Sequence, residues 1–302
     1  MATLIVFSHL RWNFVYQRPQ HLLSRVAQRC RVLFFEEPVH DAAEPHLERI
    51  TACPGVEVLR PHTPLPDAGF AEQQFPVLQR LLDEHLAQGV ERPLYAWAYT
   101  PMALPLIEAL QPDKVIYDCM DALAQFKYAP PQLAALEGAL MQRADVVFCG
   151  GVSLHRARAD KHRNIHCFPS SVDAQHFAPR DASRVGADPQ AGIAHPRIGY
   201  CGVIDERIDL DLVEAAARKR PEWQFVLVGP VVKIDPSQVP ALPNVHQFGQ
   251  QAYADLPRFM AGWDVAIMPF ALNEATEFIS PTKTLEYLAA DRPVVSTPVA
   301  DV

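Results

Sequence analysis

The segment from Ser280 to Glu286 combines residue types that together suit a phosphate group and a sugar. Ser280 is expected to cap a helix and Pro281 to take its first position, where a missing N–H costs nothing. The helix start would offer the free N–H groups of Thr282 and Lys283, the positive end of the helix dipole and the Lys283 ammonium. Glu286 would lie on roughly the same face, where it could accept hydrogen bonds from a sugar hydroxyl.

The same pattern also fits an ordinary capped surface helix. Leu285, Leu288 and Ala289 recur at helical spacing and predict an apolar stripe packed against a core. On this interpretation Lys283 and Glu286 form a solvent-exposed pair with no ligand. The local pattern therefore leaves both a ligand site and a surface helix open.

Composition limits the classes of protein that the chain can belong to. Its 302 residues, 49% hydrophobic and 21% charged, are enough for two globular domains of about 150 residues each. A net charge of −8 argues against a general nucleic-acid binder but leaves room for a local basic pocket. The six cysteines are scattered without a C-x-x-C pair, which indicates reduced thiols and a cytoplasmic protein. No signal peptide, membrane-spanning run or zinc-ligand spacing is recognisable.

The predicted elements alternate strands with helices. In the first part of the chain we expect strands at residues 4–7, 32–35, 56–59, 94–98, 115–117 and 146–149, and helices at about 19–29, 75–87 and 131–143. Residues 36–70 are otherwise expected to be irregular and proline-rich. The G-x-G-x-x-G turn is missing after the first strand, so this part is a poor candidate for a dinucleotide site.

A second run of alternating elements follows a polar stretch. Residues 179–196, with scattered Gly and Pro, are the expected linker. Strands are then predicted at 197–202, 224–228, 245–248, 265–268 and 294–297, and helices at 210–219 and 253–261. This alternation predicts an α/β protein with two Rossmann-like domains, residues 1–178 and 197–302, facing each other across a cleft. Ligands would bind beyond the carboxyl ends of the strands.

Four stretches of the second run carry a family resemblance: residues 198–209, 225–230, 244–249 together with 263–270, and 278–298. With them the chain resembles the nucleotide-sugar-dependent glycosyltransferases of the two-Rossmann architecture called GT-B. Residues 17–21 and 117–121 are similar to one bacterial family 1/4-like branch, which makes cell-surface polysaccharides and is sometimes fused to a UDP-galactopyranose mutase. The resemblance implies that the second domain binds the nucleoside diphosphate of the donor and the first domain binds the acceptor.

A donor site follows from this resemblance. Lys283 and the helix start would hold the diphosphate and stabilise negative charge on the leaving nucleotide, while Glu286 would bind ribose hydroxyls. Gly202 would let the backbone approach the diphosphate. The implied donor-binding set is Gly202, Arg207, Phe248, Gly249, Ser280, Thr282, Lys283 and Glu286.

Two members of this set have alternative roles. Arg207 either neutralises a phosphate or forms a salt bridge with Asp205 or Asp209. Phe248 either borders the base beside Gly249 or is a core strand residue.

Asp118 and Asp121 are the candidate catalytic residues, because the first domain should supply a carboxylate or histidine that deprotonates the acceptor or stabilises oxocarbenium-like charge. They follow a predicted buried strand, and three-residue spacing on an opening helix would place them on one side. Two nearby carboxylates can split their pKa values and leave one as a base near neutral pH. In the alternative, Asp118 is an N-cap and Asp121 interacts with the helix dipole.

The acceptor side has four further candidates. His9, Arg18 and His21 are expected in loops at the cleft, and Arg18 could recognise a phosphate or carboxylate of the acceptor. Tyr99 either lines the same cleft or packs beneath it.

One position departs from the family pattern. Many retaining members have a Glu where this chain has Phe278, and either Glu277 or Glu274 could substitute for it. Inversion and retention therefore both stay open. No Asp-x-Asp metal pair stands out, so we expect neither a metal nor another cofactor, with Lys and Arg replacing a metal at the leaving group.

The expected function is a hexosyl-type glycosyltransferase that moves a sugar from a UDP-linked donor to a saccharide or lipid-linked acceptor. It would be cytoplasmic, with peripheral association at the inner face of the membrane and no nucleic-acid partner. The alternatives are a GT-B-like sugar epimerase and a non-catalytic nucleotide-sugar-binding domain. Because the chain stops at Val302, directly after a predicted strand, we expect the C-terminal domain to be incomplete.

Overall fold

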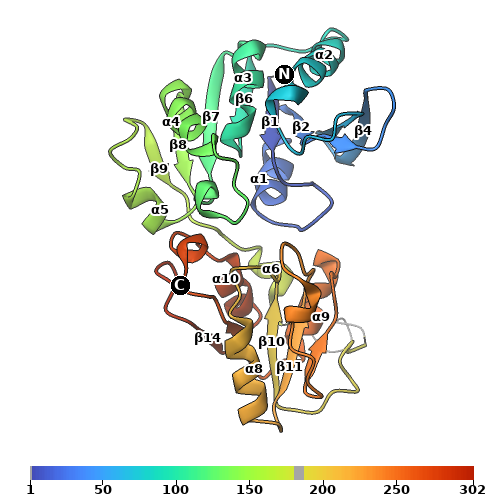
Figure 1. Cartoon of the computed structure of the whole chain (residues 1–302), viewed down its shortest axis with the longest axis vertical. Helices are drawn as coiled ribbons and strands as arrows, with labels where there is room; N and C mark the ends of the chain where they lie inside the picture. The colour runs from blue at the N-terminus through green and yellow to red at the C-terminus, as the bar shows by residue number, and fades with distance from the viewer. Residues whose placement is uncertain (1, 180–186) are drawn as a thin grey trace. The chain divides into compact units, whose positions relative to one another are not determined.

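The computed structural model describes residues 2–179 and 187–302, which divide into two compact units (Figure 1). Unit 1 comprises the chain up to residue 124 and residues 129–168, and unit 2 comprises residues 125–128 and 169–302. Residues 180–186 of the expected linker lie outside the described residues.

Unit 1 is built on a nine-stranded sheet in the order β3-β5-β2-β1-β6-β7-β8-β9, with β4 paired to β5. All its strand pairs are parallel except β4 with β5. The strands are β1 Thr3–Ser8, β2 Arg31–Glu36, β3 Val39–His40, β4 His46–Cys53, β5 Val56–Thr63, β6 Leu94–Ala98, β7 Lys114–Cys119, β8 Val146–Cys149 and β9 Ile165–Cys167. The helices are α1 Arg18–Val26, α2 Phe75–Leu86, α3 Leu104–Leu110, α4 Leu133–Arg143 and α5 Val152–Arg156.

Strand β1 is the centre of this unit, since its neighbours are β2 on one side and β6 on the other. The chain order reverses between β1 and β6, which makes their carboxyl ends the switch point where ligands bind in such sheets. On one face Leu4 and Val6 pack with Leu23 of α1. On the other face Phe7 contacts Phe35 and Phe70. Both faces of β1 are therefore buried, as its continuous apolar run predicts.

The expectation that residues 36–70 are mostly irregular is wrong. β4 and β5 form an antiparallel hairpin, and β5 continues to Thr63. The turn contains Gly55 at φ +81°, a conformation that glycine adopts without strain. The sequence signal is weak because β4 is an edge strand, paired only with β5, and has no fully buried residue.

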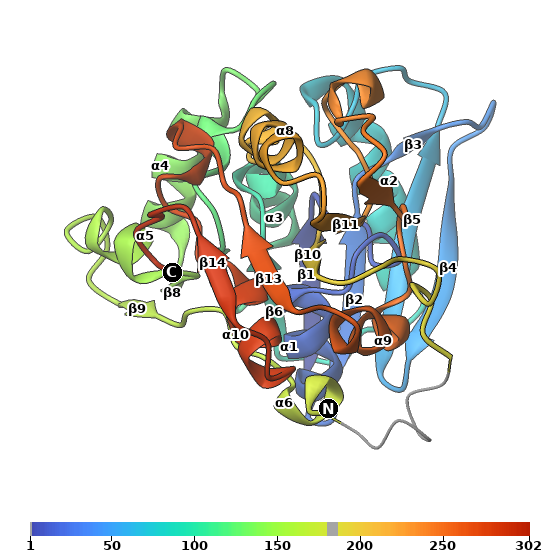
Figure 2. The same ribbon diagram turned by 90° about the horizontal axis from the view of Figure 1, so that it is seen from below.

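Unit 2 has a five-stranded parallel sheet in the order β12-β11-β10-β13-β14. The strands are β10 Arg197–Cys201, β11 Gln224–Val228, β12 Val245–Gln247, β13 Val265–Met268 and β14 Val294–Ser296. The helices are α6 Ala174–Phe177, α8 Leu210–Lys219, α9 Leu256–Ala261 and α10 Thr282–Ala289. Figure 2 shows α8 on one face of this sheet and α9 and α10 on the other. The order reverses between β10 and β13, so this unit has its own switch point.

The segments on either side of residues 180–186 pack against the rest of unit 2. His176 of α6 stacks on Tyr253 at 4.2 Å, and its Nε2 forms a hydrogen bond with the backbone carbonyl of Tyr253, 2.9 Å away. Gln190 is buried, donates to the carbonyl of Phe259 and accepts from Trp263 Nε1. Unit 1 accordingly ends at Phe168, before the predicted boundary at residue 178.

The two-Rossmann fold class is confirmed by these sheets, each parallel apart from the β4 hairpin and each covered by helices on both faces. None of the helices in residues 2–179 and 187–302 is long and apolar enough to cross a bilayer.

Two glycines predict opposite effects on stability. A Cβ on Gly199 in β10 would lie 1.9 Å from the indole of buried Trp263, so Gly199→Ala should destabilise unit 2 by about 1–3 kcal/mol through overpacking. Gly138 is exposed inside α4, and a Cβ there would meet no atom within 4 Å, so Gly138→Ala should stabilise unit 1 by about 0.5–1 kcal/mol. Urea denaturation followed by circular dichroism measures both changes, and a stable Gly199→Ala protein would contradict this packing.

Candidate functional site

Three glycines line the carboxyl edge of the unit 2 sheet. Gly202, Gly229 and Gly249 follow β10, β11 and β12, with φ values of +144°, +147° and +62°. The Gly202 N–H donates to the Val228 carbonyl and the Gly229 N–H to the Gly249 carbonyl, each at 2.8 Å. A Cβ on Gly229 would lie 1.9 Å from the Gly202 carbonyl oxygen. Glycine at these positions lets three strand ends come together without side chains between them.

Helix α10 is anchored to the end of β10 by Tyr287. Its fully buried hydroxyl accepts from the Cys201 N–H at 2.8 Å and donates to the Cys201 carbonyl at 3.3 Å. The helix begins at Thr282, with Pro281 rather than Ser280 at the N-cap, so the predicted start is wrong by one position. The predicted apolar stripe is also wrong, because Leu285 and Leu288 are exposed. Tyr287 packs the helix instead.

Lys283 sits one turn before Tyr287 and reaches over Gly202. A Cβ on Gly202 would lie 2.0 Å from Lys283 Cε and 2.7 Å from Nζ, so only glycine leaves room for this side chain. The ammonium lies 5.8 Å from the Tyr200 ring centroid and 6.0 Å from that of Phe270. Both rings offer a cation a favourable face without neutralising its charge. The site therefore presents a positive charge at the switch point between β10 and β13.

The pKa values of Lys283 and Glu286 are both displaced toward their neutral forms. Burial, with the nearby Arg207 charge, lowers the pKa of Lys283, and Glu286 opposes that fall. Burial raises the pKa of Glu286, and Lys283 opposes that rise. In the described part of the chain, neither side chain forms a hydrogen bond or ion pair with a protein partner. Both groups are thus left available for a polar ligand, and a bound anion would restore the charge of Lys283.

Arg207 makes a salt bridge with Asp205, not with Asp209. Its Nε and Nη2 bind both oxygens of buried Asp205, at 2.7 Å for the shortest contact. Asp209 instead caps α8 by accepting from the Leu212 N–H. The Arg207 guanidinium also lies 5.5 Å from the ring centroid of Phe126, within unit 2. The salt bridge orients Arg207, while its contact with a phosphate stays a prediction.

Phe248 and Gly249 differ in what they contribute. Phe248 is partly buried and meets Phe259 edge to face at 5.1 Å, which favours the packing role. Gly249 offers its carbonyl to Gly229 and leaves open space where its Cβ would be. Among the predicted donor residues, the structure brings Gly202 and Lys283 into direct contact and places Glu286 on the next turn of α10.

In unit 1, Asp118 forms a buried ion pair with Arg18. The Asp118 side chain is fully buried and receives Arg18 Nε at 3.0 Å and Nη2 at 3.0 Å, across 100 residues of sequence. Arg18 Nη1 also donates to the Phe168 carbonyl at 2.7 Å. Burial raises the pKa of Asp118, and the guanidinium opposes that rise. This pair joins the start of α1 to β7 and to the end of β9.

The predicted helix at Asp118 is wrong, because this residue lies inside β7 and caps nothing. Asp121, two residues beyond the strand, is half-buried, and its charge contributes to the raised pKa of Asp118. A fully buried carboxylate held by a bidentate arginine fits a positioning role better than proton transfer. Of the Asp118 and Asp121 carboxylates, only that of Asp121 is accessible to solvent.

The other acceptor-side candidates lie near the carboxyl edge of unit 1. His9 is half-buried directly after β1, and His21 on α1 meets Tyr16 edge to face at 4.7 Å. Tyr99 is buried at the end of β6, where burial and the Asp118 charge raise the pKa of its hydroxyl well above the usual range. Tyr99 thus packs under the edge and does not line it.

Several residues that shape the sites were not predicted from the sequence. Tyr200 and Phe270 lie against the Lys283 ammonium, Gly229 approaches Gly202, and Tyr287 binds Cys201. The sequence contexts of these four residues are typical of turn and core residues. Gly229 could have been found, since it follows a predicted strand in the same way as Gly202. Among residues 2–179 and 187–302, no three His, Cys, Asp or Glu side chains form a group that could hold a metal ion.

Two parallel-sheet units, one with a cation and a glycine-lined backbone at its switch point, define a protein of the GT-B class. The fold is shared with sucrose-phosphate synthase of Thermosynechococcus elongatus, at a TM-score of 0.74 and 15% identity, covering 99% of this chain and 82% of that one. It is also shared with Anabaena HepE, solved with UDP-glucose, at a TM-score of 0.70 and 14% identity, covering 100% and 82%.

Residues 195–302 match the family model described as Glycosyl transferases group 1. A Bacillus subtilis (strain 168) protein, named for a glycosyltransferase of teichuronic acid biosynthesis (TuaH), is 28% identical over 243 residues. That match covers 73% of this chain, which spans 59% of the relative's length. The resemblance to GT-B nucleotide-sugar glycosyltransferases is thereby confirmed.

The Arg18–Asp118 pair predicts a large stability effect. Asp118→Asn leaves the Arg18 charge buried without its partner, which should lower the free energy of unfolding by about 3–5 kcal/mol. Asp160→Asn, at an exposed position, is the matched control and should change stability by less than about 0.5 kcal/mol. Urea denaturation measures both, and a fully stable but inactive Asp118→Asn protein would instead support a direct catalytic role.

Proposed function

We propose that this protein is a glycosyltransferase that moves a sugar from a nucleotide-sugar donor, UDP-linked, to a saccharide or lipid-linked acceptor. The group 1 family match over residues 195–302 supports the reaction class. The relative named for teichuronic acid biosynthesis supports a role in cell-surface polysaccharide synthesis. The structural neighbour solved with UDP-glucose supports the choice of uridine.

The observation that carries the proposal is the Lys283 ammonium held over Gly202 at the unit 2 switch point. A nucleoside diphosphate brings two negative charges, and the ammonium with the Thr282 and Lys283 N–H groups at the start of α10 would bind them. Glu286, on the next turn, would accept hydrogen bonds from ribose hydroxyls. The open space at Gly249 would admit the base against the backbone.

In the proposed transfer, the bond from the sugar C1 to the diphosphate oxygen breaks, and the diphosphate leaves with the electron pair. Lys283 stabilises that developing charge, so a metal ion is not required. The acceptor oxygen forms the new bond to C1 and loses its proton to a base on unit 1. Asp121 is our candidate for that base, and Asp118 holds Arg18 in position beside it.

A donor panel tests the proposal. Thermal-shift measurements with UDP-, GDP- and dTDP-glucose should give the largest midpoint increase with the UDP-sugar, because a ligand that binds the native state stabilises it. UDP release on adding an acceptor pool would support transfer. Donor conversion without an acceptor would point to an epimerase, and binding with neither outcome to a non-catalytic module.

Lys283→Ala should weaken UDP-glucose binding. Loss of a charge-assisted contact to the diphosphate costs about 1.5–3 kcal/mol, a roughly tenfold to hundredfold increase in Kd. Lys219→Ala removes the same charge from an exposed position on α8 and should leave Kd unchanged. Isothermal titration calorimetry measures the wild type, both single variants and the double variant Lys283→Ala, Glu286→Ala. Equal affinity of wild type and the Lys283→Ala, Glu286→Ala double variant would rule out this donor site.

Donor binding should also depend on pH in a bell-shaped way. The free protein holds Lys283 with a lowered pKa, so deprotonation at rising pH removes the ammonium and weakens binding. Glu286 has a raised pKa, so protonation at falling pH removes the acceptor for ribose. These two pKa shifts bring both sides of the bell-shaped curve closer to neutral pH. Calorimetry with UDP-glucose in buffers of different ionisation enthalpy should detect proton uptake at alkaline pH, and uptake that persists in Lys283→Ala would contradict the assignment.

A further inference from the structure

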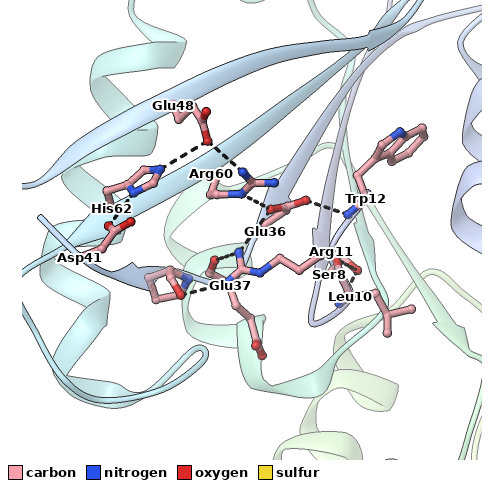
Figure 3. A network of polar contacts seen from close by, with 11 residues as sticks. Ser8, Leu10, Arg11, Trp12, Glu36, Glu37, Asp41, Glu48, Arg60 and His62 are labelled. Carbon is pink, nitrogen blue, oxygen red and sulfur yellow. Dashed lines mark hydrogen bonds and ion pairs between the residues drawn. The ribbon is translucent and has the colours of Figure 1, made fainter. Parts of the chain in front are cut away.

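A buried acid organises the edge of unit 1 beside β1. Glu36, the last residue of β2, is fully buried and accepts from Arg11 at 3.2 Å, Arg60 at 2.7 Å and the Trp12 N–H at 2.7 Å. These contacts tie the loop after β1 to β2 and β5 (Figure 3). Three donors to one carboxylate satisfy a charge that would otherwise be costly to bury.

The network continues outward through other paired acids. Arg60 also binds Glu48 at 3.0 Å. His62 contacts Asp41 at 2.7 Å and Glu48 at 3.4 Å, as Figure 3 shows. Donors are therefore plentiful at this edge, and the carboxylates of Glu36, Glu48 and Asp41 each have at least one.

Glu37, the next residue after β2, is different. Arg11 donates to the backbone carbonyls of Glu37 and Pro38, not to the Glu37 carboxylate. That carboxylate has no hydrogen-bond partner among the described residues, although the side chain is half-buried. Figure 3 shows it pointing away from the network. Arg11 thus holds the backbone at Glu37 and forms no hydrogen bond with the Glu37 carboxylate.

A glycine makes room for this unpaired acid. Gly69 has φ +67°, and a Cβ there would lie 3.0 Å from Glu37 Oε1 and 3.2 Å from Cδ. Burial raises the pKa of Glu37 to about 7, and the Arg11 charge opposes the rise. A half-buried carboxylate without donors costs stability, and such groups concentrate at functional sites.

The place of Glu37 in the sheet points to a ligand. It lies at the carboxyl end of β2, which pairs with β1, and the unit 1 switch point lies between β1 and β6. Ligands in parallel sheets bind beyond this edge. The group that lacks a protein partner is therefore on the edge where a ligand would supply one.

We propose that Glu37 is an acceptor-binding residue, whose carboxylate accepts hydrogen bonds from hydroxyl groups of an uncharged sugar held on unit 1. This inference rests on the proposed function, since it names the chemistry of the acceptor. An acidic sugar would place a second carboxylate beside Glu37 and be repelled. Two hydroxyls on one sugar ring can donate to the two oxygens of one carboxylate.

Direct binding of a probe sugar tests the role without a donor. Ligand-observed NMR titration should show glucose binding to the wild type more tightly than glucuronate. Glu37→Gln should weaken glucose binding by about tenfold, because a charge-assisted hydrogen bond becomes a neutral one. Glu108→Gln removes the same charge from an exposed position on α3 and should bind as the wild type does. Glucose affinity should fall below about pH 7 in the wild type and stay level in Glu37→Gln, as the carboxylate of the wild type takes up a proton.

The effect of Glu37→Gln on thermal stability distinguishes a ligand-binding role of Glu37 from a purely structural one. A structural role predicts that the variant has a lower Tm than the wild type. Because burial raises its pKa, ionised Glu37 destabilises the fold above that pH, so Glu37→Gln should match or exceed the wild-type Tm at pH 8. A lowered Tm, no glucose binding by the wild type, or equal binding by wild type and Glu37→Gln would each overturn the proposal. Failure of UDP-sugars to bind would instead overturn the proposed donor function, because the glucose titration contains no donor.

Discussion

The proposed donor site depends on the close approach of Lys283 to the backbone at Gly202. The side chain occupies the space where any other residue would carry a Cβ. Gly229 allows the same closeness between the next two strand ends, and Tyr287 fixes the distance by hydrogen bonds to Cys201. A cation is thereby placed against aromatic rings and the Gly202 backbone, and no carboxylate among the described residues forms a salt bridge with it. The anion binding that we propose at this switch point would follow from backbone geometry as much as from the lysine itself.

The half-buried and fully buried carboxylates described above differ in whether an arginine binds them. Asp118 and Glu36 are fully buried and each is held by arginine, so their charges serve the fold. Glu286 and Glu37 are only half-buried, and their carboxylates have no hydrogen-bond donor among the described residues. A carboxylate without hydrogen-bond donors lowers the stability of the folded protein, and a bound ligand that supplies donors would offset this loss. This contrast in hydrogen bonding is the reason why we propose ligand-binding roles for Glu286 and Glu37 and not for Asp118 or Glu36.

Much of the fold was predictable because apolar runs are bounded by turn residues. The strands Leu94–Ala98, Val146–Cys149 and Gln224–Val228 begin and end where their sequence pattern predicts. β4 was missed because an edge strand with no fully buried residue lacks the alternation that marks a half-buried one. The α10 stripe was misassigned because Leu285 and Leu288 repeat at helical spacing but are exposed, while one tyrosine carries the packing.

The sequence by itself determined the alternation of strands and helices, the glycines after the strands, and the placement of Lys283 and Glu286 on one helix. These are local properties, set by backbone sterics and side-chain periodicity over a few residues. Only the tertiary structure decided that Arg18 pairs with Asp118 across 100 residues, that Asp205 rather than Asp209 takes Arg207, and that Glu37 is left without a donor among the described residues. Burial and charge pairing depend on which distant segments meet, and no local pattern records that.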